Sequence, residues 1–478
     1  MEKLIVRKNV MKQIYKILLL TGLLAFGSAS FAKDADDPNF NNWPNAAYSW
    51  LNVTSLGDTH SLTTTVLSDF VNLHYVATSR YLNDPASNYT IYDRAAYVWG
   101  QRVPISTDYV QVNNHGGSEL MMVGGGYYFV HIGKDKSTAK RAIIAVRTDY
   151  YRNYVTIYTN DSNIDLTKSI LKNIESYLDK KNIYKNGVVE FKEYKIGFMQ
   201  NTNNYQYKWD DLIIDKTIKD VTYLNTHEFL NKFPTYKTYG VKPKKGILLQ
   251  GPPGTGKSFL GQIMISNVLH GNLKNKSSFF YLSARHLNGS KRIKRLFDAA
   301  KLISPTTLFM EDIDLVGVSS RGGSKKPVYN QIVLNEFLNG LDGLVESEGI
   351  LTVATTNRGD ALDPALLRSG RLGLHITFDL PKFSVRKEFF IKYGKRKAVW
   401  DVDVDVEWLA SESEKFSGAD IIEAIDLAKQ MAFQQNSKTK DGENLLLTKA
   451  HFAKAFSIIS VNQDGKSFIQ ALDVSSLR

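Results

Sequence analysis

The stretch GPPGTGKS at residues 251–258 decides the fold of this chain. The apolar run GILLQ at 246–250 precedes it and predicts a buried strand, and FLGQIM at 259–264 follows it and predicts a helix. A glycine-rich loop between a strand and a helix is typical of a P-loop, because its backbone N–H groups and the helix dipole attract phosphate. The alternative is a plain Gly/Pro turn between the strand and the helix, but such a turn would not require these eight residues.

The predicted phosphate site continues into the first turn of the helix. We expect the ammonium group of Lys257 to reach the β- and γ-phosphates of ATP, and the hydroxyl of Ser258 to bind Mg²⁺. The residues predicted here to bind the nucleotide are Gly251, Pro252, Pro253, Gly254, Thr255, Gly256, Lys257, Ser258 and Phe259.

Composition limits the classes of protein that are possible. The 478 residues suggest two to three domains, and 43% hydrophobic residues are ample for packed cores. The absence of cysteine excludes disulfides, thiolate catalysis and cysteine-bound zinc. A net charge of +12 permits contact with nucleic acid or an anionic membrane, but the lysines are scattered, so a lysine-rich surface is the preferred interpretation.

Residues 1–32 have the pattern of a signal peptide or a membrane anchor. Basic residues precede an apolar run at 17–26, and SFA at 30–32 is similar to a cleavage site. Export conflicts with a need for ATP, so three explanations stay open: an anchor with unusual topology, an organellar presequence, or a mis-set start. We leave the localisation open, although ATP dependence favours an ATP-containing compartment, with membrane association through this segment as one option.

The region before the P-loop predicts two further parts. In the helical or irregular region 33–86, Leu62, Val66, Phe70, Leu73 and Val76 recur at helical spacing and predict an amphipathic helix.

Residues 87–200 predict a strand-rich α+β domain without a catalytic constellation. The expected strands lie at 90–99, 119–123, 127–132, 141–147, 154–159 and 188–198, with a helix at 166–178.

From residue 205 onward the chain alternates strand and helix, as parallel α/β domains do. After the P-loop strand, further buried strands are expected at 278–282, 306–310 and 349–355, with helices near 291–302 and 328–340.

Polar side chains follow two of these strands. Glu311 and Asp312 end one strand, where Glu311 would hold Mg²⁺ through its water shell and Asp312 would polarise the attacking water. Asn357 ends the next strand and has a neutral amide that can orient water. Arg368 and Arg371, in LDPALLRSGR at 362–371, suit arginine fingers that act on a neighbouring subunit.

Together, GPPGTGKS, FMEDID, LNGLDGL, TTN, LDPALLRSGR and FSGAD resemble the AAA module of AAA+ ATPases. The resemblance implies a large P-loop subdomain over 205–380, a small helical lid over 381–460 and a tail over 461–478. It places Gly418 and Ala419, where FSGAD opens a lid helix, near the adenine. It also implies a homo-oligomeric ring, hexameric or heptameric, with ATP between subunits.

A narrower resemblance is to the mitochondrial translocase that assembles the cytochrome bc complex. It rests on Glu before Asp at 311–312, TTN at 355–357, and a hydrophobic segment and a strand-rich domain before the module. FSGAD is more typical of the wider AAA group. The segment LNGSK at 287–291 lacks the aromatic residue that peptide-threading relatives carry in a pore loop.

The sequence therefore predicts an oligomeric, chaperone-like ATPase that remodels or translocates a protein client of unknown identity. One alternative is a slow, nucleotide-gated scaffold, suggested by the exchanged carboxylates. Another is a DNA-dependent motor, but no helix-turn-helix, zinc module or continuous basic stripe supports it, so no nucleic acid partner is expected. No HExxH motif indicates a metalloprotease.

Overall fold

The computed structural model of the protein describes most of the chain between residues 43 and 463. The described ranges are 43–54, 59–66, 78, 81–84, 87–98, 101–103, 108–114, 117–123, 126–133, 139–148, 153–160, 164–180, 182–192, 195–287, 290–317, 328–344, 349–395, 398–435 and 445–463. Within these ranges, no helix has both the length and the apolar character needed to cross a membrane. The predicted segment 1–32 lies outside them.

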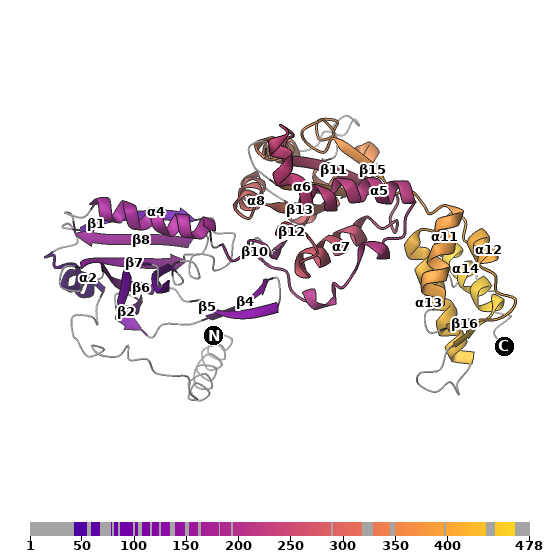
Figure 1. The fold of residues 1–478 in the computed structure, drawn as a ribbon, viewed down its shortest axis with the longest axis horizontal. Helices are drawn as coiled ribbons and strands as arrows, with labels where there is room; N and C mark the ends of the chain where they lie inside the picture. Colours follow the sequence, from indigo (N-terminus) through magenta and orange to yellow (C-terminus); the bar gives the residue numbers. More distant parts are fainter. Residues whose placement is uncertain are drawn as a thin grey trace, which may run out of the picture.

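Three parts follow one another along the long axis of the molecule, namely a strand-rich part, a central sheet with helices and a helical lid (Figure 1). In the first part, an antiparallel sheet has the strand order β1-β8-β7-β6-β2-β3. Its strands are β1 (Thr59–Val66), β2 (Tyr89–Val98), β3 (Gln101–Val103), β6 (Gly126–Ile132), β7 (Lys140–Thr148) and β8 (Asn153–Asn160). A separate hairpin pairs β4 (Asp108–Asn114) with β5 (Gly117–Val123).

The first sheet carries apolar side chains on both faces. Alternate residues of a strand point to opposite faces of a sheet, so neighbouring residues pack against different helices. Tyr128 and Val130 of β6 share a hydrophobic cluster with α4 (Ile164–Lys180). Tyr127 and Phe129 pack instead with α2 (Trp43–Leu51). One helix therefore covers each face.

The predicted helix from Leu62 to Val76 is wrong at its start, where the chain forms β1. The run Thr63, Thr64, Thr65 and Val66 is β-branched, which favours an extended chain, and it pairs antiparallel with β8. Pairing with a neighbouring strand outweighed an apolar spacing that also fits a helix. Residues 67–77 lie outside the described ranges.

The central sheet has the order β10-β9-β12-β13-β14-β11-β15. Its strands are β9 (Val188–Lys192), β10 (Lys195–Phe198), β11 (Lys244–Gln250), β12 (Ser278–Ser283), β13 (Thr306–Glu311), β14 (Ile350–Thr356) and β15 (Leu374–Thr377). All its pairings are parallel except that of β10 with β9.

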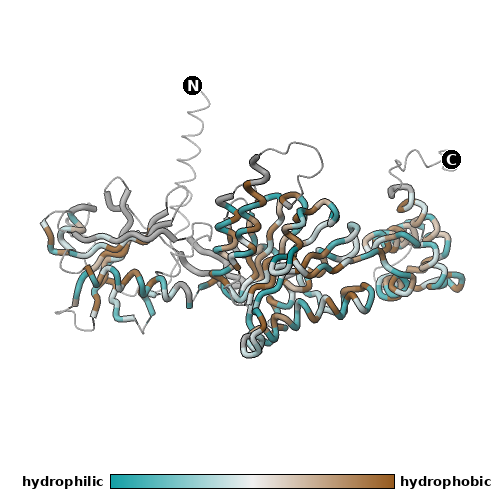
Figure 2. Tube along the Cα trace, turned by 90° about the horizontal axis from the view of Figure 1, so that it is seen from above, coloured by the Kyte–Doolittle hydropathy of each residue, from teal (hydrophilic) through white to brown (hydrophobic). Residues whose placement is uncertain are grey.

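Helices cover both faces of this sheet, so its inner strands are continuous apolar runs (Figure 2). One face packs against α8 (Ser290–Leu302) and α10 (Val328–Gly343). The other packs against α6 (His227–Thr238) and α7 (Lys257–Leu269), with α5 (Lys216–Asn225) beside them. The strands and helices predicted from residue 246 onward are present, whereas the edge strand β15 was not predicted.

The predicted strand at 188–198 differs from the structure in form and in place. It is a hairpin, β9 and β10, and it does not join the first sheet. Instead β9 pairs in parallel with β12, from Val188 opposite Phe279 to Phe191 opposite Leu282. The chain that leaves the strand-rich part thus extends the central sheet at its edge.

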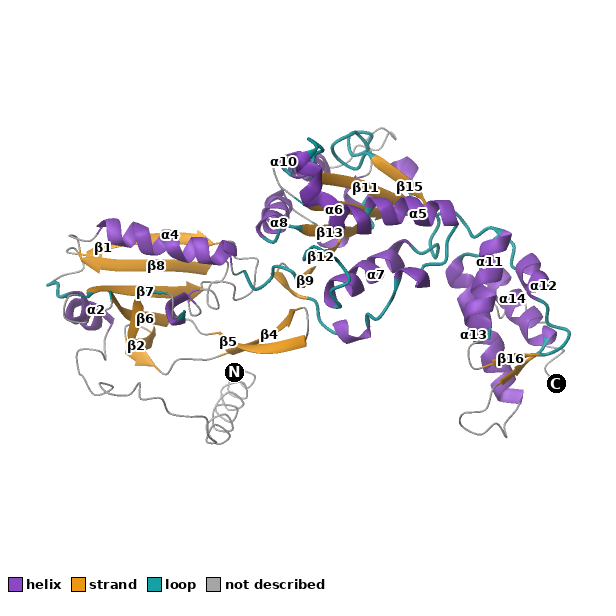
Figure 3. Ribbon diagram, viewed as in Figure 1, coloured by secondary structure: helices purple, strands orange, loops and turns teal. Residues whose placement is uncertain are grey.

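The lid contains α11 (Phe383–Phe389), α12 (Val406–Glu412), α13 (Gly418–Gln435) and α14 (Lys449–Gln463), in the region predicted to be helical. Its core includes Phe390, Phe452 and Phe456, whose rings meet edge to face or tilted. A short parallel pair, β16 (Ala398–Trp400) and β17 (Leu445–Leu447), joins these helices (Figure 3).

Candidate nucleotide-binding site

The loop between β11 and α7 has the backbone geometry of an anion-binding loop. Gly251, Gly254 and Gly256 have φ values of 141°, 76° and 103°, a region that side chains disfavour. At Gly251 a Cβ atom would lie 2.1 Å from the carbonyl oxygen of Phe378, so only glycine fits there. The predicted strand, loop and helix are therefore present.

Lys257 supplies a buried positive charge at this loop. Its side chain is nearly fully buried, and its Nζ donates to the carbonyl oxygens of Gly251 at 2.7 Å and Pro252 at 2.6 Å. Burial lowers the pKa of Lys257, while the nearby Asp312 acts in the opposite direction. An ammonium group held among carbonyls beside a helix N-terminus is suited to an anionic phosphate, so these residues fit a nucleotide.

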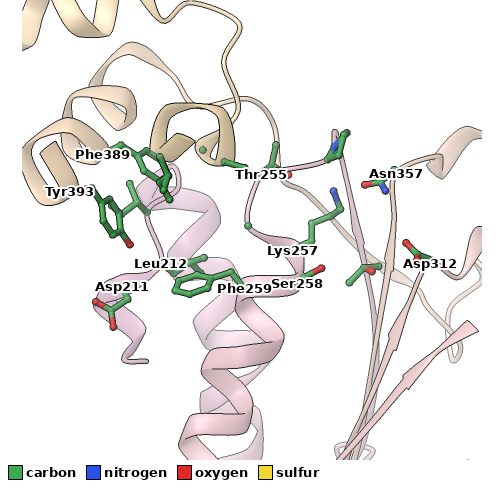
Figure 4. A pocket seen from close by; sticks show the side chains of 18 residues that line it. Asp211, Leu212, Thr255, Lys257, Ser258, Phe259, Asp312, Asn357, Phe389 and Tyr393 are labelled. Carbon is green, nitrogen blue, oxygen red and sulfur yellow. The ribbon is translucent and has the colours of Figure 1, made fainter. Parts of the chain in front are cut away.

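A cavity of about 360 Å³ lies around this loop and is large enough for a small ligand. In Figure 4 the P-loop residues lie between the lid aromatics on one side and Asn357 and Asp312 on the other. The predicted residues that line the cavity are Pro253, Gly254, Thr255, Gly256, Lys257, Ser258, Phe259, Asp312, Asn357, Gly418 and Ala419. Residues 251 and 252 contribute instead the carbonyls that hold Lys257.

Several lining residues were missed by the sequence analysis. They are Asp211, Leu212, Ile213, Thr355, Phe389, Tyr393 and Ile422. Most come from the segment before α5 and from the lid, so their common role depends on the tertiary fold. The rings of Phe389 and Tyr393 stack with centroids 6.2 Å apart and form an aromatic wall opposite the phosphate loop. Such a wall suits a planar base.

The lid touches the P-loop through its FSGAD segment. The backbone N–H of Ala419 donates to the carbonyl of Gly254 at 3.1 Å. Ser417 and Asp420 exchange hydrogen bonds at the start of α13, as in a capping box. A Cβ atom at Gly254 would lie 2.4 Å from Ser417 Oγ, so the absence of a side chain permits this approach.

The two adjacent carboxylates face different spaces. Asp312 lines the nucleotide cavity, has a φ of 55°, and accepts from Arg285 Nη2 at 3.2 Å. Glu311 ends β13 and lines a second cavity of about 330 Å³, which Ser258 also lines. The predicted Mg²⁺ pair, Ser258 and Glu311, thus borders one space.

Within the described ranges, no cluster of three or more His, Cys, Asp or Glu could hold a metal ion. A cation bound here would therefore depend on Ser258, Glu311, water and phosphate oxygens. That ligand set fits Mg²⁺, which keeps several waters and takes substrate phosphates as ligands.

The two predicted arginine fingers have different surroundings, and neither lines the nucleotide cavity of its own subunit. The guanidinium of Arg371 binds Asp342 through Nε at 2.8 Å and Nη2 at 2.6 Å, and donates from Nη1 to Ala365 O at 2.7 Å. Arg368 is exposed. Arg371 is thus engaged within its own subunit, whereas Arg368 is exposed, and these contacts do not test the finger role expected of each.

The segment before α5 is also tied to the lid by ion pairs. Lys392 Nζ lies 2.9 Å from Asp211 Oδ1, and Lys382 Nζ lies 2.8 Å from Asp215 Oδ2. At Asp211 burial raises the pKa, but the bonds from Lys392 and from the backbone of Lys208 lower it, and the net shift is downward. At Asp215 the bond from Lys382 lowers the pKa. The segment that lines the nucleotide cavity is thus bonded to lid residues.

Comparison with known proteins agrees with this geometry. Residues 247–380 match the family model described as "ATPase family associated with various cellular activities (AAA)". The ATP-dependent zinc metalloprotease FtsH of Pelodictyon phaeoclathratiforme is 33% identical over 262 residues, which are 53% of this chain and 37% of the relative. The cell division cycle protein 48 homolog of Archaeoglobus fulgidus is 33% identical over 257 residues, 52% of this chain and 34% of the relative.

The 26S proteasome regulatory subunit 6A of Encephalitozoon cuniculi is 35% identical over 219 residues, which are 44% of this chain and 52% of the relative. The chain spans about a third to a half of the length of these relatives. The predicted α/β fold with a P-loop is confirmed by the family match and by the parallel sheet. Residues 247–380 therefore form an ATPase domain of the AAA family.

Proposed function

We propose that this protein is an ATP-hydrolysing AAA oligomer that couples ATP binding and hydrolysis, with Mg²⁺, to the remodelling or translocation of a protein client. The observation that carries the proposal is the cavity in which Lys257, Asp312 and Asn357 meet lid residues. AAA relatives named for ATP-dependent proteolysis and proteasome regulation support the coupling to proteins.

Each side chain has a role in this proposal. Lys257 binds the phosphates, and Ser258 with Glu311 borders the place for Mg²⁺, which would neutralise phosphate charge. Asp312 accepts a hydrogen bond from the attacking water and takes its proton. Asn357 orients that water. Phe389 and Tyr393 hold the base. Arg368 acts across the subunit interface on the phosphoryl group of a neighbour.

We further propose a homo-oligomeric ring, hexameric or heptameric, as the assembly that brings Arg368 to a neighbour. The client remains a protein of unknown identity, and residues 87–187 are our candidate for handling it. A plan like that of the mitochondrial translocase for the cytochrome bc complex is supported by the Glu311 and Asp312 order and by the strand-rich part. Membrane association through residues 1–32 belongs to the same proposal.

Grip on an unfolded chain by the 287–291 segment is not part of this proposal. Leu287 is its only large apolar residue, and this residue is 2% exposed and belongs to a hydrophobic core cluster. A buried leucine cannot contact a client in a central pore. We therefore favour movement of whole domains over threading.

A slow, nucleotide-gated scaffold is the second candidate, and one contact favours it. Arg285 forms an ion pair with Asp312, which occupies a carboxylate oxygen that would otherwise contact the attacking water. Because the Arg285 side chain is 72% exposed, we expect the pair to be weak and to yield to bound nucleotide.

Steady-state phosphate release from the full chain, with electron microscopy of the same samples in ATP, tests the proposal. We expect ring particles and multiple turnovers in the wild type, with both turnover and nucleotide binding lost in Lys257→Ala. Rings that bind ATP but release no more phosphate than the Lys257→Ala variant would support the scaffold instead.

A further inference from the structure

The hydroxyl group of Tyr281 contacts one of the two candidate carboxylates directly. Its Oη donates to Glu311 Oε2 at 2.6 Å. Parallel pairing of β12 with β13 places Tyr281 opposite Phe309, so Glu311 lies two residues farther along on the same face. A diagonal pair of this kind is within reach of a long aromatic side chain.

The cavity around this contact connects it to the start of α7. Ser258, Gly261 and Gln262 of α7 line the same space of about 330 Å³ as Tyr281 and Glu311. Ser258 also lines the nucleotide cavity. The Glu311 carboxylate is therefore held on the side of the sheet where the predicted Mg²⁺ ligand Ser258 lies.

The remaining wall comes from the chain that links the strand-rich part to the ATPase domain. Glu190 of β9 pairs opposite Tyr281, and Met199, Gln200 and Tyr205 also line the cavity. The space beside the bond from Tyr281 to Glu311 is thus lined both by α7 and by this linking chain.

We propose that Tyr281 is a positioning residue that fixes the Glu311 carboxylate for Mg²⁺ within a cavity that Glu190 of β9 also lines. This inference rests on the proposed function, in which Glu311 borders the cation. Removing the hydroxyl frees the carboxylate to rotate away from Ser258. Loss of such an outer contact typically weakens metal binding by about 10- to 100-fold.

The test uses Tyr281→Phe in the full chain, because phenylalanine keeps the ring that stacks 6.5 Å from Phe309 and removes only the hydroxyl. Binding of Mn²⁺, as a paramagnetic substitute for Mg²⁺, is measured by electron paramagnetic resonance of the free ion with saturating ADP. Binding of the fluorescent analogue mant-ADP in EDTA is measured separately. Tyr236→Phe is the matched control, since this ring packs on the same hydrophobic cluster without lining the cavity.

We expect the Kd for Mn²⁺ to rise about 10- to 100-fold in Tyr281→Phe, and to rise in Glu311→Gln, with mant-ADP affinity in EDTA unchanged. Tyr236→Phe should match the wild type in both measurements. A Kd for Mn²⁺ within about twofold of wild type in Tyr281→Phe, with normal mant-ADP binding, overturns this inference alone. Failure of the wild type to bind mant-ADP overturns the proposed function as well.

Discussion

Replacing Arg371 by alanine should lower stability, whereas replacing Arg368 by alanine should lower turnover, although the two residues stand only three positions apart. Arg371→Ala removes the bidentate contact with Asp342 and the bond to Ala365 O. The ion pair is half open to solvent, with side-chain exposures of 17% and 52%, so it contributes about 1 kcal/mol or less. The charged bond to the carbonyl adds about 1.5 kcal/mol. The expected destabilisation is therefore about 2 kcal/mol.

Thermal unfolding measures this destabilisation. For a domain of this size, 2 kcal/mol corresponds to a fall of about 4–8 °C in Tm. Arg368→Ala removes an exposed side chain and should change stability by less than about 0.5 kcal/mol. It should instead lower phosphate release on the order of 10³-fold, because a finger acts only on the transition state. Mixed rings of Arg368→Ala and Lys257→Ala subunits should regain activity, since some interfaces pair intact partners.

The acid dependence offers a second check on Arg371. Its hydrogen bonds lower the pKa of Asp342 below the ordinary carboxyl value of about 3.9. The ion pair therefore stabilises the folded protein fully at a pH above the ordinary carboxyl pKa. This stabilisation is lost as the pH falls through the pKa that Asp342 has in the folded protein. The difference in Tm between wild type and Arg371→Ala should narrow below about pH 4. An unchanged Tm in Arg371→Ala, together with a loss of turnover equal to that of Arg368→Ala, would refute this separation of roles.

The remaining predictions concern the nucleotide cavity. Lys257→Ala should abolish binding of mant-ATP measured by fluorescence, and tight binding by this variant would contradict the P-loop assignment. Asp312→Asn should keep ATP bound but stop phosphate release, because an amide cannot take a proton. If phosphate release survives in Asp312→Asn but is lost in Glu311→Gln with Mn²⁺ still bound, the roles of Asp312 and Glu311 are reversed. Phe389→Ala should weaken mant-ADP binding about tenfold through lost stacking, whereas Phe433→Ala, an exposed lid residue, should have no effect.

The phosphate half of the site could be predicted because its residues are adjacent in the chain. Eight consecutive residues specify the P-loop, and Asp312 and Asn357 each directly follow a buried apolar strand. Parallel strands place such ends at one edge of a sheet, so their meeting follows from topology alone.

The base half could not be predicted in the same way. Phe389 and Tyr393 belong to the lid, and Leu212 lies far upstream of the P-loop, so only the folded chain brings them together. Their apolar character is also that of ordinary core residues, and nothing local distinguishes them.

The different surroundings of Arg368 and Arg371 also depend on distant partners. Asp342, which binds Arg371, lies at the end of helix α10, and strand β14 lies between these two residues in the chain. The same limit explains the misplaced strand at 188–198, because an apolar run does not say which sheet it will join.

The link from the strand-rich part to the central sheet and the link from the 209–215 segment to the lid differ in strength, and this difference suggests which parts move together. Strand β9 is joined to β12 by backbone pairing, and Phe191 and Phe280 lie in one buried cluster. The links from the 209–215 segment to the lid are ion pairs whose side chains are a third or more exposed at one partner, and such pairs are weak. Strong pairing on one side and weak pairs on the other favour motion of the lid against a rigid unit. That unit would contain the central sheet and the strands that extend it, so nucleotide-driven closure of the lid would move the client-handling part together with the P-loop.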